Sequence, residues 1–406
     1  MEFKHKILNN GLTIIAERNE YAQSAAVGFF VKTGSRDENI AISGVSHFLE
    51  HMMFKGTDKL SWLDVNETFD RTGAKFNAFT SEENTVYYAA VLPEYLEQVT
   101  DLWAQLMRPA LRDADFNMEK NVIKEEIAMY KDMPQFEAMD GARNLHFGQH
   151  PCGFSVLGTN QSIDNLAAEQ MRTYFKSRYA PNNITVTLSG NFDFDKMVSL
   201  IESKTSHWIA QPAPRKLEYF AGTFQKKKIH KPNLACEHIC LVSPSVSMQD
   251  KDRYAASLLG SIIGDDSGSR FFWELVDSAL ADEASMQCEA MDGVGVNFTY
   301  IQTNPDKAQQ VTEIVDNIFA KITAEGVTEN ELVAAKNKTL SAITIKNEVP
   351  MGRLVELGVN WVYLQRYVDI NETVKQIKSI TVKQVNDLIE KYKLTDYTSF
   401  VLTPKE

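Results

Sequence analysis

Residues 44–56 read G-V-S-H-F-L-E-H-M-M-F-K-G, and within this stretch His47, Glu50 and His51 form an H-x-x-E-H motif. Residues four apart on a helix lie on the same face, so His47 and His51 are expected to point at one ion. If that ion is zinc, each ring nitrogen lies about 2.0–2.1 Å from it. Glu50 then stands beside the ion without ligating it, which is where a general base acting on metal-bound water is expected.

The bland alternative is an amphipathic helix whose two histidines are ordinary surface or core residues. Apolar residues surround almost the whole stretch, and they are Phe48, Leu49, Met52, Met53 and Phe54. Such a pattern predicts a buried helix, in which two imidazoles and a carboxylate are costly unless they pair or bind something. The metal-site interpretation is therefore favoured.

The bulk composition describes an ordinary globular chain. It has 406 residues, of which 44% are hydrophobic and 24% charged, with a net charge of -12. A chain of this length predicts two domains, and its negative charge argues against nucleic acid or an anionic membrane as partner. The N-terminus shows no signal peptide and no long apolar run occurs, so we expect a cytoplasmic protein, or a periplasmic one if the N-terminus was trimmed.

A weak internal repeat divides the chain. The segment 93–101 matches the segment 305–313 at an offset of 212, and the same offset carries Glu119 onto Glu331. An offset of about half the length predicts two homologous domains in tandem. We place them at residues 1–210 and 229–406, joined by an exposed linker over 211–228.

At this offset the second copy lacks the metal-binding residue types. His47, Glu50 and His51 correspond to Leu259, Ile262 and Ile263. The repeat therefore predicts one domain with a metal and one without. Chance similarity between two helices is the alternative explanation of the repeat.

Each half alternates between strand-like and helix-like segments, which predicts an α+β fold with a mostly antiparallel sheet covered by helices on one face. The predicted strands are 12–16, 25–33, 85–91 and 185–189 in the first half and 237–243, 295–303 and 397–402 in the second. The long predicted helices are 95–107, 117–132, 305–325 and 329–347.

A third metal ligand is not determined by spacing. Glu119 and Glu126 are seven residues apart on the predicted helix 117–132, two turns along one face. Catalytic zinc needs three protein ligands, so either carboxylate is a candidate. By spacing alone, however, a solvated charged face explains the two residues better.

The sequence resembles the pitrilysin-type zinc peptidases, whose H-x-x-E-H pattern is called inverzincin. Mitochondrial processing peptidase and insulysin belong to this family, and the length here is similar to its short two-domain branch. The resemblance covers nearly the whole chain in order. It rests on the segments 47–51, 77–81, 119–127, 179–184 and 267–272, together with Gly190.

The resemblance implies a role for particular residues. His47, His51 and Glu126 would bind Zn²⁺, Glu50 would be the general base, and Glu119 would be a supporting carboxylate. Extended peptide would add as a strand along an edge strand, which matches Asn77, Ala78, Phe79 and Thr80. The two domains would enclose a cleft that admits unfolded peptides or short segments and excludes folded proteins.

The implied activity is that of a zinc metalloendopeptidase in which Glu-assisted attack of zinc-bound water hydrolyses the peptide. A homodimer is the usual assembly of the family. Many relatives carry an Arg and a Tyr in the second domain, whereas Val276 and Asp282 stand near those positions here. The alternatives are therefore a zinc-bearing subunit that needs an Arg/Tyr-bearing partner in a heterodimer, or a non-catalytic peptide-binding or assembly protein.

Overall fold

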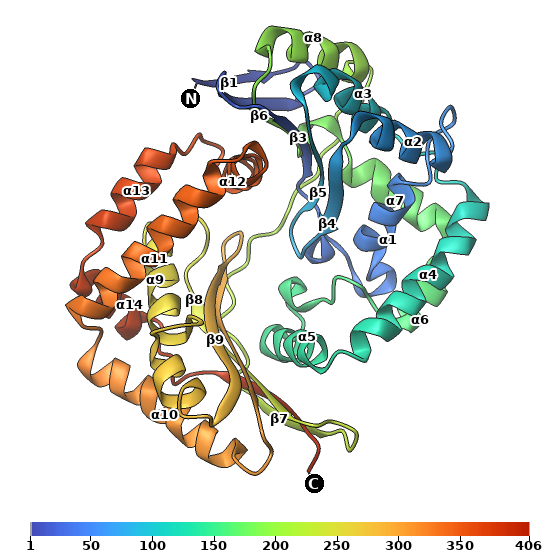
Figure 1. The fold of residues 1–406 in the computed structure, drawn as a ribbon. Coiled ribbons are helices and arrows are strands. Elements are labelled where there is room, and N and C mark those ends of the chain that lie inside the picture. Colours follow the sequence, from blue (N-terminus) through green and yellow to red (C-terminus); the bar gives the residue numbers. More distant parts are fainter. Residues whose placement is uncertain (1, 406) are drawn as a thin grey trace. The chain divides into compact units, whose positions relative to one another are not determined.

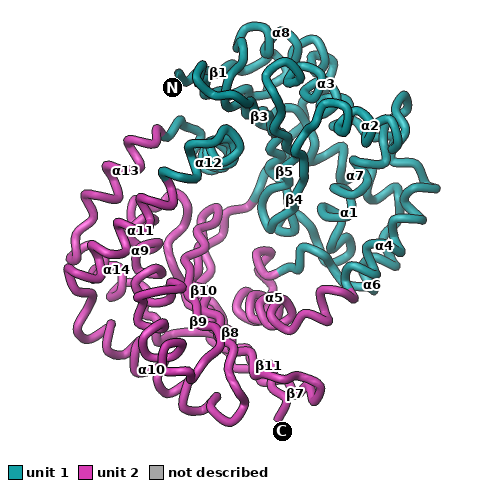
Figure 2. Tube along the Cα trace, viewed as in Figure 1, with its two compact units in different colours: residues 1–127, 154–215, 344–368 teal, residues 128–153, 216–343, 369–406 magenta. Residues whose placement is uncertain are grey.

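A computed structural model describes residues 2–405 and contains two compact α+β units (Figures 1 and 2). Unit 1 comprises residues 1–127, 154–215 and 344–368, and unit 2 comprises 128–153, 216–343 and 369–406. Each unit therefore takes one segment from the other half of the chain. The division predicted from the sequence, 1–210 and 229–406, cuts the chain into continuous segments, whereas the compact units are discontinuous. The predicted domain bounds therefore stay a prediction.

Unit 1 contains a six-stranded sheet in the order β1-β2-β6-β3-β5-β4. All its neighbouring strands pair antiparallel except β2 with β6, which pair in parallel. The strands are β1 (Glu2–Ile7), β2 (Thr13–Arg18), β3 (Ala25–Val31), β4 (Lys75–Thr80), β5 (Thr85–Val91) and β6 (Ile184–Gly190).

Unit 2 contains a five-stranded sheet in the order β7-β11-β8-β10-β9. Here too one pairing is parallel, between β11 and β7, and the others are antiparallel. The strands are β7 (Lys226–His230), β8 (Glu237–Ser245), β9 (Ala281–Ala290), β10 (Gly295–Thr303) and β11 (Thr398–Thr403).

The two sheets repeat one another at the offset predicted from the sequence. Adding 212 to Ala25, the first residue of β3, gives Glu237, the first residue of β8. The same shift relates β2, β6, β5 and β4 to β7, β11, β10 and β9, so the strand order β2-β6-β3-β5-β4 recurs as β7-β11-β8-β10-β9. The fold of two homologous, mostly antiparallel α+β domains is thus confirmed, with β1 as an additional strand in unit 1.

Helices cover both sheets, and their bounds agree with the predicted long helices to within a few residues. The first-half helices are α1 (Val45–Met53), α2 (Trp62–Thr72), α3 (Leu96–Leu106), α4 (Asp113–Lys131), α5 (Pro134–Phe147), α6 (Asn160–Asn165), α7 (Ala168–Arg178) and α8 (Phe194–Thr205). The second-half helices are α9 (Arg253–Gly264), α10 (Ala308–Glu325), α11 (Glu329–Asn347), α12 (Pro350–Leu364), α13 (Ile370–Ser379) and α14 (Val382–Lys391).

The prediction that helices cover only one face of each sheet is wrong. Every residue of β3 is buried, so both alternating sets of its side chains need a cover. Phe29 lies in the main core of unit 1, whereas Phe30 packs with Leu354 of α12 on the opposite face. The sheet of unit 2 is covered in the same way, since Cys240 of β8 packs with residues of α5. Periodicity failed here because it cannot show that a helix distant in sequence returns to the second face.

No helix within residues 2–405 is both long enough and apolar enough to span a lipid bilayer.

Candidate metal centre

Helix α1 is held by its apolar face and by its first turn. Phe48, Leu49 and Met52 are buried in the core of unit 1. Gly44 precedes the helix with a φ of 91°, a conformation that favours glycine. The Glu38 carboxylate accepts hydrogen bonds from the backbone N–H groups of Gly44 and Ser46, each at 2.7 Å. The helix start is therefore anchored by a buried side chain that satisfies two otherwise unpaired donors.

Helix α4 brings the two acidic candidates to α1. Ile123 and Ile127 of α4 are buried, and Phe116 stacks on Phe48 of α1 with ring centroids 4.7 Å apart. Glu119 and Glu126 lie on the same side of α4, and Glu119 is buried. The solvated-face explanation that spacing favoured for these two carboxylates therefore does not hold.

His47, His51 and Glu126 form one cluster. Within residues 2–405 they are the group of three potential ligands whose donor atoms all lie within 4.8 Å of one another. His47 Nε2 lies 3.6 Å from Glu126 Oε1, and His51 Nε2 lies 3.3 Å from Glu126 Oε2. Two atoms bound to one tetrahedral zinc at about 2.0–2.1 Å lie about 3.3–3.4 Å apart. The spacing and the N₂O donor set both suit a zinc ion with an open fourth position.

Glu119 contacts the His51 ring at the nitrogen that lies away from the cluster. Its Oε1 accepts the Nδ1–H of His51 at 2.9 Å, which leaves Nε2 of that ring for the cluster. Lys55 Nζ lies 2.5 Å from Glu119 Oε2. A carboxylate that receives the second N–H of a ligating histidine sets its tautomer and orientation. Within the described chain His47 Nδ1 has no such acceptor.

The electrostatics of the two histidines differ. Burial, with the neighbouring His51 charge, lowers the pKa of His47, so this ring is neutral and its lone pair is available. Burial also opposes the charge of His51, but hydrogen bonds to Glu119 and Glu126 outweigh it and raise the His51 pKa to about 9. A metal ion that binds here must therefore displace a proton from His51.

Glu50 lies beside the cluster and is held by the neighbouring sheet. Thr80 Oγ1 donates a hydrogen bond of 2.6 Å to Glu50 Oε2. Burial raises the Glu50 pKa, although the Thr80 hydrogen bond and the His51 charge act against that shift. A carboxylate with a raised pKa is better matched to proton transfer near neutral pH than an ordinary one.

The predicted substrate residues lie on β4, which is one of the two edge strands of its sheet. Ala78 is buried, whereas Asn77 and Phe79 are exposed, as strand alternation requires. The Thr80 side chain donates a hydrogen bond to Glu50, which leaves its backbone groups for strand pairing. The structure therefore places Thr80 between the edge strand and the carboxylate, and the roles of all four residues stay predictions.

Sequence reasoning missed Lys55 and Glu38. Lys55 follows His51 by four residues, and this spacing was the available signal. Glu38 gives no local signal because its partners are backbone groups. The two positions in unit 2 where many relatives carry Arg and Tyr are occupied here by Val276 and Asp282. Val276 ends a short π-helical turn (Phe272–Val276), and Asp282 is the second residue of β9.

Comparison with known sequences agrees with this architecture. The profile of Insulinase (Peptidase family M16) matches residues 13–160, and that of the Peptidase M16 inactive domain matches residues 165–339. An uncharacterized zinc protease of Mycobacterium leprae (strain TN) is 31% identical over 98% of this chain and 91% of its own length. The uncharacterized zinc protease YmxG of Bacillus subtilis (strain 168) is 29% identical over 99% of this chain and 98% of its own.

Solved structures show the same fold. A protease from Helicobacter pylori superimposes with a TM-score of 0.92 at 23% identity, covering 99% of both chains. At that identity the match supports the fold alone. The sequence matches over nearly the whole length carry the further conclusion that this chain belongs to peptidase family M16, the insulinase family.

Proposed function

We propose that the chain is a zinc-dependent endopeptidase that hydrolyses extended, unfolded peptides or short protein segments. The observation that carries this proposal is the cluster of His47, His51 and Glu126, whose spacing suits one tetrahedral ion. Zinc proteases among the relatives add support. Bound zinc would supply a Lewis acid that polarises the scissile carbonyl and acidifies water.

The surrounding residues have distinct tasks in this proposal. His47, His51 and Glu126 hold the ion, and Glu119 keeps His51 in the required tautomer. Glu50 accepts a proton from the attacking water and returns it to the leaving amine. Thr80 occupies Glu50 Oε2, and in the described chain Oε1 has no hydrogen-bond partner, so Oε1 is the oxygen that exchanges the proton.

Substrate binding by strand addition follows from the position of β4. An edge strand within the described sheet has a row of backbone N–H and C=O groups without a strand partner. An extended peptide can pair with that row whatever its side chains are. Because Thr80 ends β4 and contacts Glu50, a peptide paired along Asn77–Thr80 would run past the proposed base.

The test combines zinc content with cleavage of a quenched peptide library. We expect about one zinc per chain and cleavage that a chelator abolishes. Glu50→Gln should keep the zinc and reduce turnover by about 10²–10⁴-fold, the usual contribution of general acid–base catalysis. Zinc-free wild-type protein, or unchanged turnover in Glu50→Gln, would contradict the proposal.

A second candidate is a zinc-bearing subunit that works only with a partner. The observation that favours it is the presence of Val276 and Asp282 where many relatives carry Arg and Tyr. Sedimentation of the purified chain separates the homodimer expected for a self-sufficient enzyme from a species awaiting a partner. A chain that holds stoichiometric zinc and cuts nothing alone would support the partner-dependent form.

A further inference from the structure

A second feature of unit 1 is a groove of about 670 Å³ beside α7, away from the metal-ligand residues. Arg108, Trp208 and Phe175 are among the residues that line it. Lys176, Ser177 and His207 are exposed and line its wall. A volume of this size is typical of sites for small molecules.

Arg108 in this groove is a cation without a carboxylate. Its guanidinium stacks 3.7 Å from the ring centre of Trp208 and lies 5.7 Å from that of Phe175. Its one hydrogen bond in the described structure is donated by Nη1 to the carbonyl oxygen of Met107 at 2.5 Å. Burial lowers the pKa of Arg108 to about 10, and no acidic residue acts against that shift. The remaining N–H donors are held in a fixed plane by the stacking but are not satisfied by protein.

The residues that line the groove indicate the charge of its ligand. No aspartate or glutamate lines it among the described residues, although the chain has a net charge of -12. Lys176 adds a second cation, and within residues 2–405 it makes no ion pair. Thr173 adds a hydroxyl group, whereas the Ser177 hydroxyl already donates its proton to the carbonyl oxygen of Tyr174. Cations and hydroxyls without acids make a surface that attracts anions.

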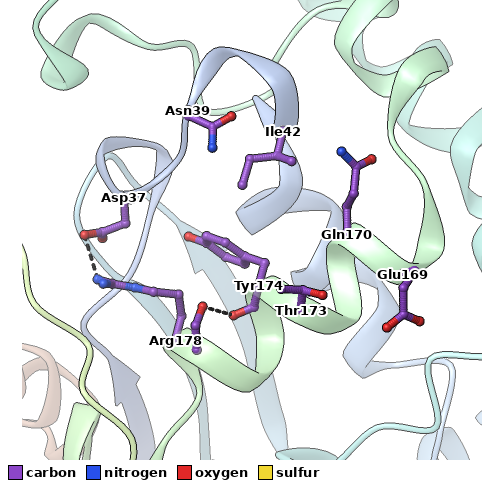
Figure 3. A pocket seen from close by; sticks show the side chains of 9 residues that line it. Asp37, Asn39, Ile42, Glu169, Gln170, Thr173, Tyr174 and Arg178 are labelled. Carbon is purple, nitrogen blue, oxygen red and sulfur yellow. Dashed lines mark hydrogen bonds and ion pairs between the residues drawn. The ribbon is translucent and has the colours of Figure 1, made fainter.

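A second cavity in the same unit contains an arginine that is paired with a carboxylate. That cavity, of about 460 Å³, is lined by Asp37, Tyr174 and Arg178 among others (Figure 3). Arg178 Nη2 lies 2.6 Å from Asp37 Oδ1, and Figure 3 shows the two side chains pointing at each other. Arg215 pairs with the same carboxylate at 2.6 Å. The Arg178 guanidinium is thus paired with a carboxylate of the protein, whereas that of Arg108 is not.

We propose that the groove of Arg108, Lys176 and His207 binds a small oxyanion, a phosphate or carboxylate group, with the Arg108 fork as its anchor. A guanidinium presents parallel N–H groups that match the two oxygens of such a group. The stacked Trp208 and Phe175 fix the direction of the fork, which reduces the ordering cost of binding. The site is separate from peptide hydrolysis and does not depend on the proposed enzymatic function.

The test titrates the zinc-loaded or zinc-free full chain with inorganic phosphate and, separately, with citrate. Calorimetry measures binding directly, and the fluorescence of the five tryptophans, which include Trp208, gives a second signal. Chloride at the same ionic strength serves as the reference, because salts also act through screening and through general exclusion from the surface. We expect saturable binding of one anion per chain. Saturation by phosphate identifies a phosphate-type ligand, and saturation by citrate alone identifies a carboxylate.

Arg108→Met should weaken this binding by about tenfold or more, the loss expected for a charge-assisted fork. Arg108→Lys keeps the charge but not the fork and should bind with intermediate affinity. Arg71→Met, an exposed arginine on α2 outside the groove, is the matched control and should bind like wild type. Equal binding by wild type and Arg108→Met, or no saturable binding in wild type, overturns the proposal.

Loss of the Arg108 stacking could instead unfold the chain, so a second pair of variants is needed. Lys176 is exposed, and Lys176→Met should fold normally and weaken anion binding by a smaller factor. Lys6→Met removes an exposed lysine from β1 and should leave binding unchanged. If Lys176→Met and Lys6→Met bind the anion equally well, Lys176 has no part in the site and the proposed constellation is wrong.

Discussion

Helices α1 and α9 occupy equivalent places in the two halves of the repeat but differ in the residues that they place at equivalent positions. At the offset of 212, His47 and His51 of α1 correspond to Leu259 and Ile263 of α9. Leu259 and Ile263 are buried among the apolar residues of unit 2. The fold thus requires a helix at this place whose apolar face is buried, and it does not require a metal.

The acidic helices extend the comparison. Glu119 of α4 corresponds to Glu331 of α11, and Glu126 corresponds to Lys338, since 126 plus 212 is 338. Glu331 pairs with Arg270 at 2.8 Å, and Lys338 Nζ lies 3.4 Å from Asp265. In unit 2 a cation, Lys338, therefore stands where unit 1 has the proposed third ligand, and Glu331 forms an ion pair with Arg270.

The largest expected effect is the difference between two single variants, one at the proposed ligand His51 and one at its apolar counterpart Ile263. His51→Ala should reduce zinc affinity by more than the roughly 10–100-fold that loss of an outer-shell partner costs, and peptidase activity should be lost with the metal. Ile263→Ala should instead keep zinc and lower the free energy of unfolding by about 2–5 kcal/mol, because it leaves a cavity. Metal analysis and urea unfolding of both variants check this, and zinc loss in Ile263→Ala would break the comparison.

The second prediction compares how each unit holds the helix that it takes from the other half. Arg353 of α12 pairs with Glu17 at 2.6 Å, and both side chains are 1% exposed. Arg143 of α5 pairs with Glu289, and these side chains are 13% and 22% exposed. Arg353→Met removes the cation from the buried Glu17 carboxylate, which keeps only the Tyr367 hydrogen bond, and should cost about 3–5 kcal/mol of unfolding free energy. Arg143→Met should cost less because water can solvate Glu289, and equal losses in denaturant unfolding would contradict this reasoning.

The third prediction concerns acid stability of unit 2. Burial lowers the pKa of His146 on α5 to about 4, so the folded state excludes a proton that the unfolded state accepts below about pH 6.5. The stability due to the neutral ring is present above pH 6.5 and is lost as the pH falls towards 4. The loss is at most about 2 kcal/mol at pH 5. His146→Asn should unfold with a flatter pH dependence between 7 and 5, and identical pH profiles would rule out this role.

The smallest expected effect concerns Thr80, whose hydroxyl donates a hydrogen bond to Glu50. The residue of α9 equivalent to Glu50 is Ile262, which cannot accept such a bond. Thr80→Val removes the hydrogen bond to Glu50 while keeping the side-chain shape. We expect kcat to fall about tenfold, the value of one hydrogen bond to a charged group, with little change in KM or zinc content. Thr80→Ser keeps the hydroxyl and should restore most of the activity. Equal losses in the two variants would show that Thr80 acts only through packing.

The sequence alone determined the elements whose residues lie close together in the chain. Strands at Thr85–Val91 and Gly295–Thr303 and the helix Glu329–Asn347 form with the predicted bounds. Local patterning is sufficient there because each element satisfies its own backbone hydrogen bonds or those of an adjacent strand. The spacing of His47 and His51 likewise follows from the helical repeat, and the repeat offset of 212 predicted the second sheet.

Tertiary structure alone decided which distant residues meet. Spacing left Glu119 and Glu126 equivalent and only the family resemblance separated them, whereas the packing of α4 on α1 is what brings Glu126 to the two histidines and Glu119 to His51 Nδ1. The contact of Lys55 with Glu119 also depends on that packing. The return of α12 to the first sheet and of α5 to the second has no local signal, because burial of a second sheet face can be satisfied by any apolar helix that the chain brings there. The hydrophobic effect is non-directional, so patterning predicts that a face is buried and only the folded chain determines what buries it.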